Sequence, residues 1–390
     1  MRHLDELNAL IGQAVSSIDT PALVIDLDAM ERNLARMQAF ADAQGIKLRP
    51  HAKMHKSAWL AQQQMQAGAV GVCVQKVSEA QALAALGVSD IYISNVVPSL
   101  SKCEHFAQIL CRLPAQNASK IRLAIAVDSL QGIRALAQAM RTHASGYSVR
   151  VFIEIDAGQA RCGVGPGAAA VPLAQEIAQC AQLEFAGLQA YHGKAQHLRN
   201  AAEREAAIAS VVRDVQATKR ALESVGFAVP LVTGAGTGSF IHETASGVFG
   251  ELQAGSYLFM DADYAANEID PTAPQFEHAL FVKSQVISRH TSAVDNRAVI
   301  DAGHKSHAID SGLPKVWAGH GADWQFFNGG DEHGILRGTA LPEIGDTVWL
   351  IPGHCDPTVN LHDAMVGVRG GLAQGHVERI IMVDTRGCVR

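Results

Sequence analysis

Residues 122–155, RLAIAVDSLQGIRALAQAMRTHASGYSVRVFIEI, contain the pattern that decides the fold. Two short apolar runs of strand length enclose a longer stretch in which the apolar residues recur with helical spacing. The same alternation recurs between residues 20 and 260 with a period of about 25–35 residues, which is typical of repeated βα units in a parallel sheet. Nine runs of strand character lie in this region: 22–26, 46–50, 70–74, 90–94, 122–127, 149–155, 185–191, 230–234 and 251–259.

Two of the intervening helices have recognisable ends. Asp28 can act as an N-cap ahead of an apolar stripe, and Gly45 follows it as a stop signal. A second stripe runs from Ala201 to Glu223 and ends before Gly226, where a left-handed residue is favoured. Eight parallel strands in roughly 230 residues fit a closed (β/α)₈ barrel, whereas an open doubly wound sheet would need fewer strands or more length. One of the nine runs is therefore surplus.

After about residue 263 the pattern changes. The apolar runs are short, clusters of Gly, Pro, Asp and Asn separate them, and no long amphipathic helix is expected. We therefore expect an α/β barrel followed by an all-β domain, with the Pro-containing segment 270–275 as linker. The expected strands of this domain lie within 279–288, 297–303, 346–352, 363–369 and 378–384.

The composition excludes several classes of protein. Of 390 residues 48% are hydrophobic and 18% charged, with a net charge of −6, which indicates about two globular domains with sizeable cores. No basic run suits nucleic acid and no apolar window suits a membrane helix, so we expect neither partner. Acidic residues near the N-terminus argue against a signal peptide and favour a cytoplasmic protein. Seven cysteines without a CxxC pair favour reduced thiols.

A basic cluster follows the strand run at 46–50, and active sites of such barrels lie at the C-terminal ends of the strands. The cluster contains Lys53 and Lys56. A lysine here can form a Schiff base with a carbonyl cofactor, because burial near another cation lowers the pKa of its ammonium group. The alternative is an ordinary solvated loop, in which lysine is common.

Glycine-rich segments follow the last two strands. TGAGTGS (233–239) and Gly255-Ser256-Tyr257 offer backbone N–H groups where barrels of this type hold a phosphate, although a plain tight turn is the alternative. A phosphate site combined with a lysine at the barrel mouth predicts pyridoxal 5′-phosphate.

Two further groups of polar side chains follow strands. Arg161 could bond the ring nitrogen or phenolic oxygen of that cofactor, or form an ion pair with Glu154 or Asp156. Tyr191 ends the run at 185–191 and His197 follows it, and histidine is the natural proton acceptor near neutral pH. With 17 histidines in the chain, a structural or exposed role for His197 is the alternative.

PGHCDP (352–357) follows an expected strand of the β domain. Residues i and i+2 of an extended segment point to the same side, so His354 and Asp356 can face one cation while Cys355 points away. An imidazole and a carboxylate suit Mg²⁺, Mn²⁺ or Co²⁺, with water completing the shell. The alternative is a turn with an Asx hydrogen bond before Pro357.

The chain resembles the D-threonine aldolase family and its D-3-hydroxyamino-acid relatives over nearly its whole length. The resemblance implies a fold-type III pyridoxal-phosphate enzyme related to alanine racemase, and a homodimer with sites near the subunit interface. It also implies a barrel over 29–264 and a β domain formed by 1–28 and 265–390, which includes the surplus run at 22–26. The segments that carry it are 49–57, 73–80, 154–164, 188–197, 233–239, 251–264, 331–334 and 352–363.

The resemblance assigns roles to individual residues. It implies that Lys53 forms the Schiff base, with Lys56 as its rival on sequence grounds, and that His354 and Asp356 hold the metal. It also implies that His197 is the candidate base and that Tyr191 is a catalytic tyrosine. Further implied cofactor-binding residues are Gln75, Arg161, Tyr191, Gly236, Thr237, Gly255, Ser256 and Tyr257.

The activity expected from this resemblance is a metal-dependent retro-aldol cleavage of D-3-hydroxy-α-amino acids to glycine and an aldehyde. Cleavage of 3-hydroxy-D-aspartate to glyoxylate, dehydration, racemisation and a non-enzymatic cofactor carrier are the alternatives. The related dehydratases have Cys two residues after the metal-binding His, where this chain has Asp356, which favours an aldolase. His304, His307 and His333 are candidates for a substrate pocket, each with a structural alternative.

Overall fold

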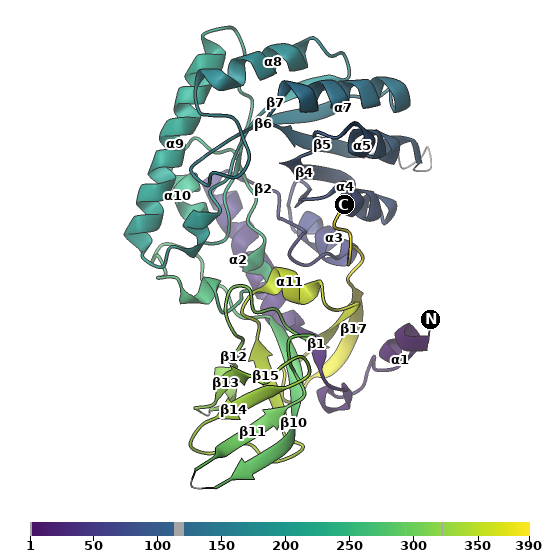
Figure 1. Ribbon diagram of the computed structural model, residues 1–390, viewed down its shortest axis with the longest axis vertical. Helices are drawn as coiled ribbons and strands as arrows, with labels where there is room; N and C mark the ends of the chain where they lie inside the picture. Colours follow the sequence, from purple (N-terminus) through teal and green to yellow (C-terminus); the bar gives the residue numbers. More distant parts are fainter. Residues whose placement is uncertain (1, 113–120, 293, 322) are drawn as a thin grey trace.

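The computed structural model describes residues 2–112, 121–292, 294–321 and 323–390. An eight-stranded sheet lies at one end of an elongated molecule and a nine-stranded, mainly antiparallel sheet lies at the other (Figure 1). The eight-stranded sheet is entirely parallel, in the order β2-β9-β8-β7-β6-β5-β4-β3. Its strands are β2 (Lys47–Leu48), β3 (Val72–Val74), β4 (Asp90–Val96), β5 (Arg122–Val127), β6 (Val149–Ile155), β7 (Leu183–Ala190), β8 (Val232–Gly234) and β9 (Glu251–Leu252).

Backbone hydrogen bonds close this sheet into a barrel. The Cys73 N–H donates to the Pro50 carbonyl and the Ala52 N–H donates to the Cys73 carbonyl, both at 2.8 Å. These bonds join the segment after β2 to β3, which confirms the predicted closed barrel. The helices that cover its outside are α2 (Leu27–Gln44), α3 (Ala58–Gln66), α4 (Val77–Ala85), α5 (Leu100–Arg112), α7 (Leu130–His143), α8 (Val171–Ala178), α9 (Ala201–Glu223) and α10 (Phe240–Ala245).

Asp26, rather than Asp28, caps the first of these helices. The Ala29 N–H donates to the Asp26 carboxylate at 3.1 Å, whereas Asp28 lies in the first turn. The expected cap is wrong because β1 (Ala22–Asp26) passes into α2 without a loop. Gly45 ends α2 with φ of 64°, and Gly226 after α9 has φ of 89°, as the sequence predicts.

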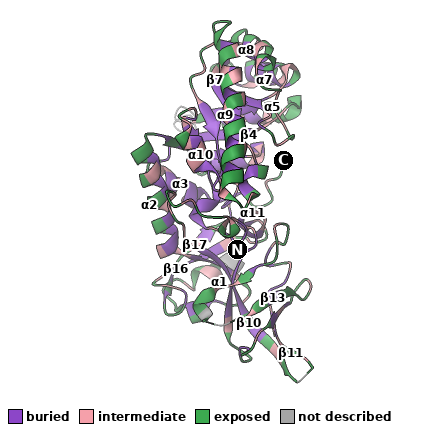
Figure 2. Cartoon of the chain, turned by 90° about the vertical axis from the view of Figure 1, so that its left-hand side faces the viewer, coloured by how far each residue is buried: buried purple, intermediate pink, exposed green. Residues whose placement is uncertain are grey.

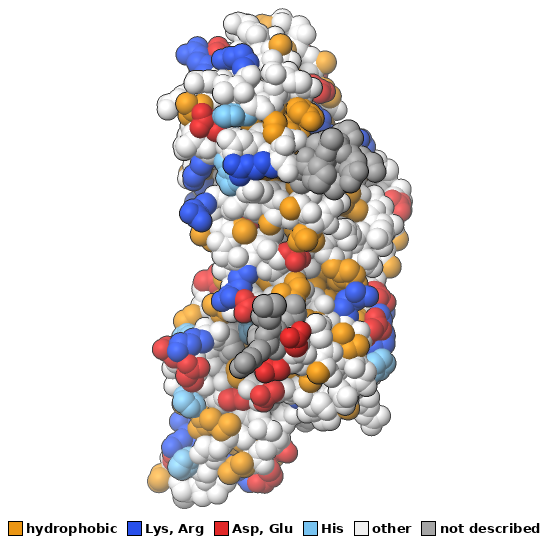
Figure 3. Space-filling model, turned by 90° about the vertical axis from the view of Figure 1, so that its right-hand side faces the viewer, with side chains coloured by type: hydrophobic (Ala, Val, Ile, Leu, Met, Phe, Trp, Pro, Cys, Tyr) orange, Lys and Arg blue, Asp and Glu red, His pale blue; other side chains and the backbone are white. Residues whose placement is uncertain are grey.

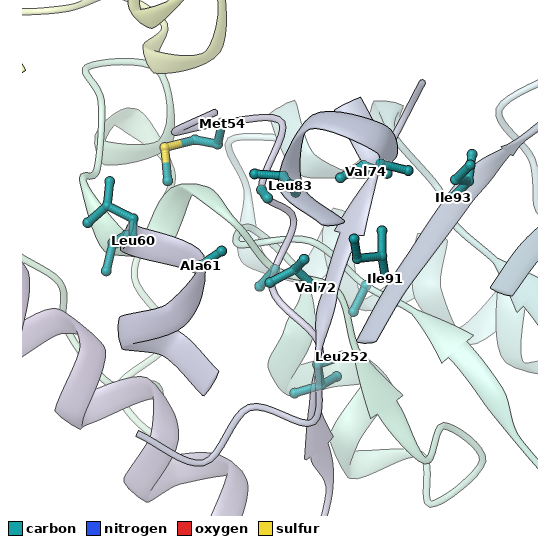
Figure 4. Close-up of a cluster of buried hydrophobic side chains, with 14 of the residues drawn as sticks. Met54, Leu60, Ala61, Val72, Val74, Leu83, Ile91, Ile93 and Leu252 are labelled. Atoms are coloured by element: carbon teal, nitrogen blue, oxygen red, sulfur yellow. The ribbon is translucent and has the colours of Figure 1, made fainter. Parts of the chain in front are cut away.

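The core of the barrel half lies mostly between the strands and the helices. Ile91 and Ile93 of β4 point outward to the helices, and Tyr92 between them points into the barrel, where its ring lies 4.9 Å from that of Phe152. The strands of the barrel are largely buried, whereas the outer face of α9 is exposed (Figure 2). Figure 4 shows one part of the core, with Met54, Leu60, Ala61, Val72, Val74, Leu83, Ile91, Ile93 and Leu252.

The second sheet forms the predicted β domain, and β1 belongs to it, as expected for the surplus run. β1 pairs antiparallel with β10 and parallel with β16. The division of the chain at residues 28 and 264 stays a prediction. The strands after residue 263 are β10 (Leu280–Thr291), β11 (Asn296–Ile300), β12 (Lys315–Val316), β13 (Gln325–Asn328), β14 (Gly334–Arg337), β15 (Thr347–Ile351), β16 (Ala364–Arg369) and β17 (His376–Met382).

Short helices complete the chain. Among the described residues after 263 the longest is α11 (Cys355–Val359), so the expectation of no long helix there is confirmed. The strand expected over 251–259 is wrong beyond Leu252, because the chain turns after Gly255 into a 3₁₀ helix. The remaining short elements are α1 (Arg2–Asn8), η1 (Val15–Ser17), η2 (Ala168–Ala170), η3 (Lys194–His197), η4 (Ser256–Leu258), η5 (Tyr264–Ala266) and η6 (Ala318–His320).

The surface shows mixed charge on the face seen in Figure 3. Lys and Arg side chains are interspersed with Asp and Glu along this face, and acidic side chains gather in its lower half. Among the described helices none combines the length and apolar character needed to cross a bilayer.

Candidate active site

A cavity of about 350 Å³ lies at the C-terminal ends of the barrel strands. The segment that begins α11 in the β domain contributes to its wall, so both parts of the chain form the cavity. In Figure 1, α11 lies between the barrel and the second sheet. The sequence-predicted site residues that line the cavity are Lys53, Gln75, Arg161, Tyr191, His197, Gly236, Thr237, Gly255, Ser256, His354 and Asp356.

Tyr257 does not line the cavity. Its side chain is fully buried, and its hydroxyl accepts a hydrogen bond from Gln64 Nε2 at 3.1 Å. The Tyr257 N–H donates to Thr237 Oγ1 at 3.0 Å, so the residue supports the glycine loop from behind. The turn into η4 accounts for this placement, because it directs the ring into the core.

Lys53 and its rival Lys56 occupy different environments. Lys53 Nζ lies in the cavity, 3.4 Å from Asp356 Oδ2. Burial alone would lower the pKa of Lys53, but the neighbouring Asp356 carboxylate outweighs it and raises this pKa. The lowered pKa expected from the sequence is therefore wrong. Lys56 is buried away from the cavity, where its Nζ donates to Glu79 Oε1 at 2.6 Å and to the Thr385 carbonyl at 3.3 Å.

Gly236, in the glycine loop 233–239, and Gly255 both line the cavity. A Cβ on Gly255 would come within 2.9 Å of the His51 carbonyl oxygen, and a Cβ on Gly236 would collide with the Gln196 side chain. The backbone contact excludes a larger residue at Gly255, and a larger residue at Gly236 would displace the Gln196 side chain. Gln196 also holds the loop, because its Oε1 accepts from the Gly238 N–H at 2.9 Å.

Glu243 is a buried carboxyl next to this loop, and it predicts a pH dependence of stability. Glu243 accepts a hydrogen bond from Ser239 Oγ at 2.8 Å, and burial raises its pKa to about 7. The folded protein therefore holds this proton between about pH 4.5 and 7 while the unfolded chain loses it, so stability falls as pH rises through this range.

We expect Glu243→Gln to remove this pH dependence. The stability of the variant relative to wild type should rise by as much as about 3 kcal/mol between pH 4.5 and 8. Urea unfolding of the cofactor-free proteins at several pH values measures the difference. Glu184→Gln, which changes an exposed carboxyl on β7, should show no such trend. A constant difference between Glu243→Gln and wild type across this range would contradict the prediction.

Arg161 stacks on Tyr191 in the cavity wall. The guanidinium carbon lies 5.8 Å from the centre of the Tyr191 ring. In the described part of the chain Arg161 forms no ion pair with Glu154 or Asp156, the alternative that the sequence allowed. Asp156 instead accepts the N–H groups of its own loop, and burial raises the pKa of Glu154 to about 7.

His197 has a fixed orientation. Its Nδ1 lies 2.6 Å from Asp263 Oδ2, and Asp263 also forms an ion pair with Arg199. The carboxylate favours the tautomer with the proton on Nδ1, which leaves Nε2 as an acceptor. The ring of Tyr264, another cavity residue, lies 6.0 Å from the imidazole ring.

His354 and Asp356 both line the cavity, although their backbone is not extended throughout. His354 is extended, with φ of −145° and ψ of 125°, whereas Asp356 lies in the first turn of α11. The expected extended segment is therefore wrong at Asp356. The two side chains nevertheless meet, with His354 Nε2 3.7 Å from Asp356 Oδ1. Cys355 is fully buried.

The partners of this pair suit a divalent cation. His354 Nδ1 lies 2.7 Å from Asp310 Oδ2, which leaves Nε2 toward Asp356. Asp356 Oδ1 is buried and has no hydrogen-bond partner among the described residues. A histidine oriented by a carboxylate, beside an unpaired carboxylate oxygen, is typical of metal ligands. The described residues contain no group of three or more His, Cys, Asp or Glu placed to hold a metal, so other ligands would have to complete the shell.

Sequence reasoning missed some residues and misplaced others. Asp310 and Tyr264 were not identified, because each acts through a contact with a residue distant in the sequence. His304, His307 and His333 do not line the cavity. The fully buried His307 packs its ring 5.2 Å from that of Phe326, which favours its structural alternative.

The chain is similar to known protein domains and enzymes over nearly its whole length. Residues 25–263 match the alanine racemase N-terminal domain, and residues 279–368 match a serine dehydratase domain. D-threonine aldolase from Arthrobacter sp. is 41% identical over 383 residues, which cover 97% of this chain and 96% of that protein. The chain belongs to the D-threonine aldolase family. A second relative, 3-hydroxy-D-aspartate aldolase from Paracoccus denitrificans, is 40% identical over 98% of this chain and 96% of its own length.

A solved structure from the D-threonine aldolase family has the same arrangement of the two sheets. The crystal structure of D-threonine aldolase from Filomicrobium marinum superposes with a TM-score of 0.90, with 44% identity, over 97% of this chain and 98% of that one. The alanine racemase-like fold of this family implies pyridoxal phosphate. The lysine, the glycine-lined wall and the stacked Arg161 and Tyr191 in one cavity fit such a group.

Proposed function

We propose that the protein is a pyridoxal-phosphate- and divalent-metal-dependent aldolase that cleaves D-3-hydroxy-α-amino acids to glycine and an aldehyde. The observation that carries this proposal is the meeting of Lys53, His197 and the His354–Asp356 pair in one cavity. The relationship to D-threonine aldolase and 3-hydroxy-D-aspartate aldolase over nearly the full chain supports it.

The residues on the barrel side of the cavity would hold the cofactor. Lys53 would attach it, and the backbone of the glycine loop, with Thr237 and Ser256, would receive its phosphate. Gln75, Arg161 and Tyr191 would contact its ring. When bound, pyridoxal phosphate supplies an electron sink for the carbon that loses its bonding partner.

The residues on the opposite side would act on the β-hydroxyl of the substrate. His354 through Nε2 and Asp356 through Oδ1 would hold the cation, which supplies a Lewis acid for this hydroxyl. Cleavage of the Cα–Cβ bond requires removal of the hydroxyl proton. His197 would accept this proton at Nε2, and Asp263 at Nδ1 would stabilise the resulting imidazolium.

One observation favours a second candidate substrate. Lys194 lines the same cavity as Arg161 and His197, so a cationic group is available for a carboxylate on the β-carbon. The 3-hydroxy-D-aspartate aldolase relative has 40% identity with this chain. Cleavage of 3-hydroxy-D-aspartate to glycine and glyoxylate is therefore our second candidate.

A product assay tests the proposed function. Purified protein with pyridoxal phosphate and Mn²⁺ is given D-threonine, L-threonine, D-serine and the stereoisomers of 3-hydroxyaspartate, with and without chelator. We expect glycine and an aldehyde from D-configured substrates, and loss of both products with chelator. Ammonia and a keto acid would identify a dehydratase instead. Cofactor attachment without turnover of any substrate would favour a carrier.

Two further properties belong to the same proposal. The family resemblance supports a homodimer with its active sites near the subunit interface. Sedimentation analysis of the purified protein tests the dimeric state. The seven cysteines form no CxxC pair, which favours reduced thiols and supports a cytoplasmic location.

A further inference from the structure

Asp261 is a fully buried carboxylate outside the cavity. It lies in the segment Asp261–Tyr264 that follows η4 at the end of the barrel. Its two oxygens accept hydrogen bonds from two different parts of the chain. Oδ1 accepts from the Tyr264 N–H at 2.9 Å, and Oδ2 accepts from the Cys355 N–H at 3.0 Å. One side chain thus joins the end of the barrel to the peptide between His354 and Asp356.

The N-terminus of α11 depends on this contact. The N-cap residue His354 makes no capping hydrogen bond with its own side chain. Asp261 supplies the acceptor for the first N–H of the helix from a segment nearly one hundred residues earlier. Two backbone bonds hold the same segments together: Ala262 N–H donates to the Pro352 carbonyl at 2.9 Å, and Asp263 N–H donates to the Gly353 carbonyl at 3.3 Å.

The segment that carries Asp261 also carries residues of the opposite cavity wall. Asp263 orients His197, and the Tyr264 side chain lines the cavity. Met260, which immediately precedes Asp261, has φ of 48°, a left-handed conformation that is costly for a non-glycine residue. The segment therefore fixes the position of both walls.

We propose that Asp261 is a positioning residue for the metal pair, which it holds at a fixed distance from His197 by capping α11 from the barrel side. This inference rests on the proposed function, because it assumes that His354 and Asp356 bind a cation. Without Asp261 the Cys355 N–H has no acceptor, and the start of α11 can shift. Since ligand separation sets metal affinity, metal binding should weaken while cofactor attachment at Lys53 remains.

The test measures the affinity of the cofactor-loaded protein for Mn²⁺. The electron paramagnetic resonance signal of free Mn²⁺ reports how much of the metal remains unbound. We expect Asp261→Ala to raise the Mn²⁺ dissociation constant by about tenfold to a hundredfold. Asp261→Asn keeps one acceptor oxygen for two donors and should give an intermediate value. Saturating Mn²⁺ should restore the turnover rate of both variants, whereas a general loss of structure would lower it at every metal concentration.

Two further variants separate positioning from stability. Asp26→Ala removes the cap of α2, and should lower the unfolding temperature without changing Mn²⁺ affinity. Cys355→Pro removes the N–H donor while keeping Asp261. Proline suits the first helical position, and the extended His354 tolerates a following proline. We expect weaker Mn²⁺ binding in Cys355→Pro as well.

The outcomes distinguish this inference from the proposed function. Wild-type affinity in folded Asp261→Ala overturns the inference alone. If Asp261→Ala does not fold, wild-type affinity in Asp261→Asn and Cys355→Pro overturns it. A wild-type protein that binds no Mn²⁺ overturns both the metal dependence and the inference. Tight wild-type binding that Asp261→Ala weakens, without aldolase activity, supports the inference and refutes the proposed reaction.

Discussion

Lys53→Ala should lose the visible absorbance of protein-attached pyridoxal phosphate, and its aldolase activity should fall by about a thousandfold or more. Lys53 lines the cavity together with Arg161 and Tyr191, and its amine lies 3.4 Å from Asp356 Oδ2. Absorbance titration with pyridoxal phosphate and a glycine-release assay measure the two effects.

Lys56→Ala is the matched control. Lys56 is three residues away in the sequence, but its amine pairs with Glu79 outside the cavity. Removing one partner of a buried ion pair costs about 3–5 kcal/mol of stability. The folded fraction of Lys56→Ala, measured well below its unfolding temperature, should still attach the cofactor. Retention of attachment in Lys53→Ala and its loss in folded Lys56→Ala would reverse the assignment.

His354→Ala should lower metal-dependent activity by about a thousandfold, because a Lewis acid of this kind contributes several kcal/mol to the reaction. Cofactor absorbance should remain, since within the described structure His354 forms neither a hydrogen bond nor an ion pair with Lys53. Asp356→Asn should lose activity to a similar extent. It is the less selective variant, because Asp356 also pairs with Lys53. Activity across a Mn²⁺ titration, with chelator-treated wild type as reference, measures the loss.

Asp310→Asn gives a graded comparison. Asn can still accept a hydrogen bond from His354 Nδ1, but it lacks the charge that makes the imidazole a better ligand. We expect Mn²⁺ affinity to fall about tenfold, with turnover restored at high Mn²⁺.

Full activity of His354→Ala in the presence of chelator would refute the metal role of His354 and Asp356.

Much of the fold could be predicted from the sequence, because alternating apolar periods directly reflect burial. The barrel strands lie where the apolar runs predict them. The errors fall where tertiary contacts override local signals. Asp28 has the properties of a cap, but β1 joins α2 directly and leaves Asp26 in the capping position. The run at 251–259 has strand composition, but the chain bends beneath the His51 backbone after Gly255.

The site was less predictable than the fold. Lys53, His197 and Asp356 follow strands or turns that place them at the barrel mouth, so position gave a usable signal. Asp261 and Asp310 act through partners 94 and 44 residues away, and no local pattern distinguishes them from other aspartates. Tyr257 is the opposite case. It was expected to bind the cofactor because it follows Gly255 and Ser256, but its ring is buried in the core.

The placement of β1 has a consequence for how the chain is made. Val24 of β1 pairs with Phe281 on one side and with Val366 on the other. These partners are synthesised more than 250 and more than 340 residues after Val24, so β1 cannot pair until then. The barrel has mostly neighbouring strand contacts and can form while synthesis continues, whereas the second sheet closes only near the end of translation. His354 and Asp356 therefore join the cavity wall after the barrel residues that line it.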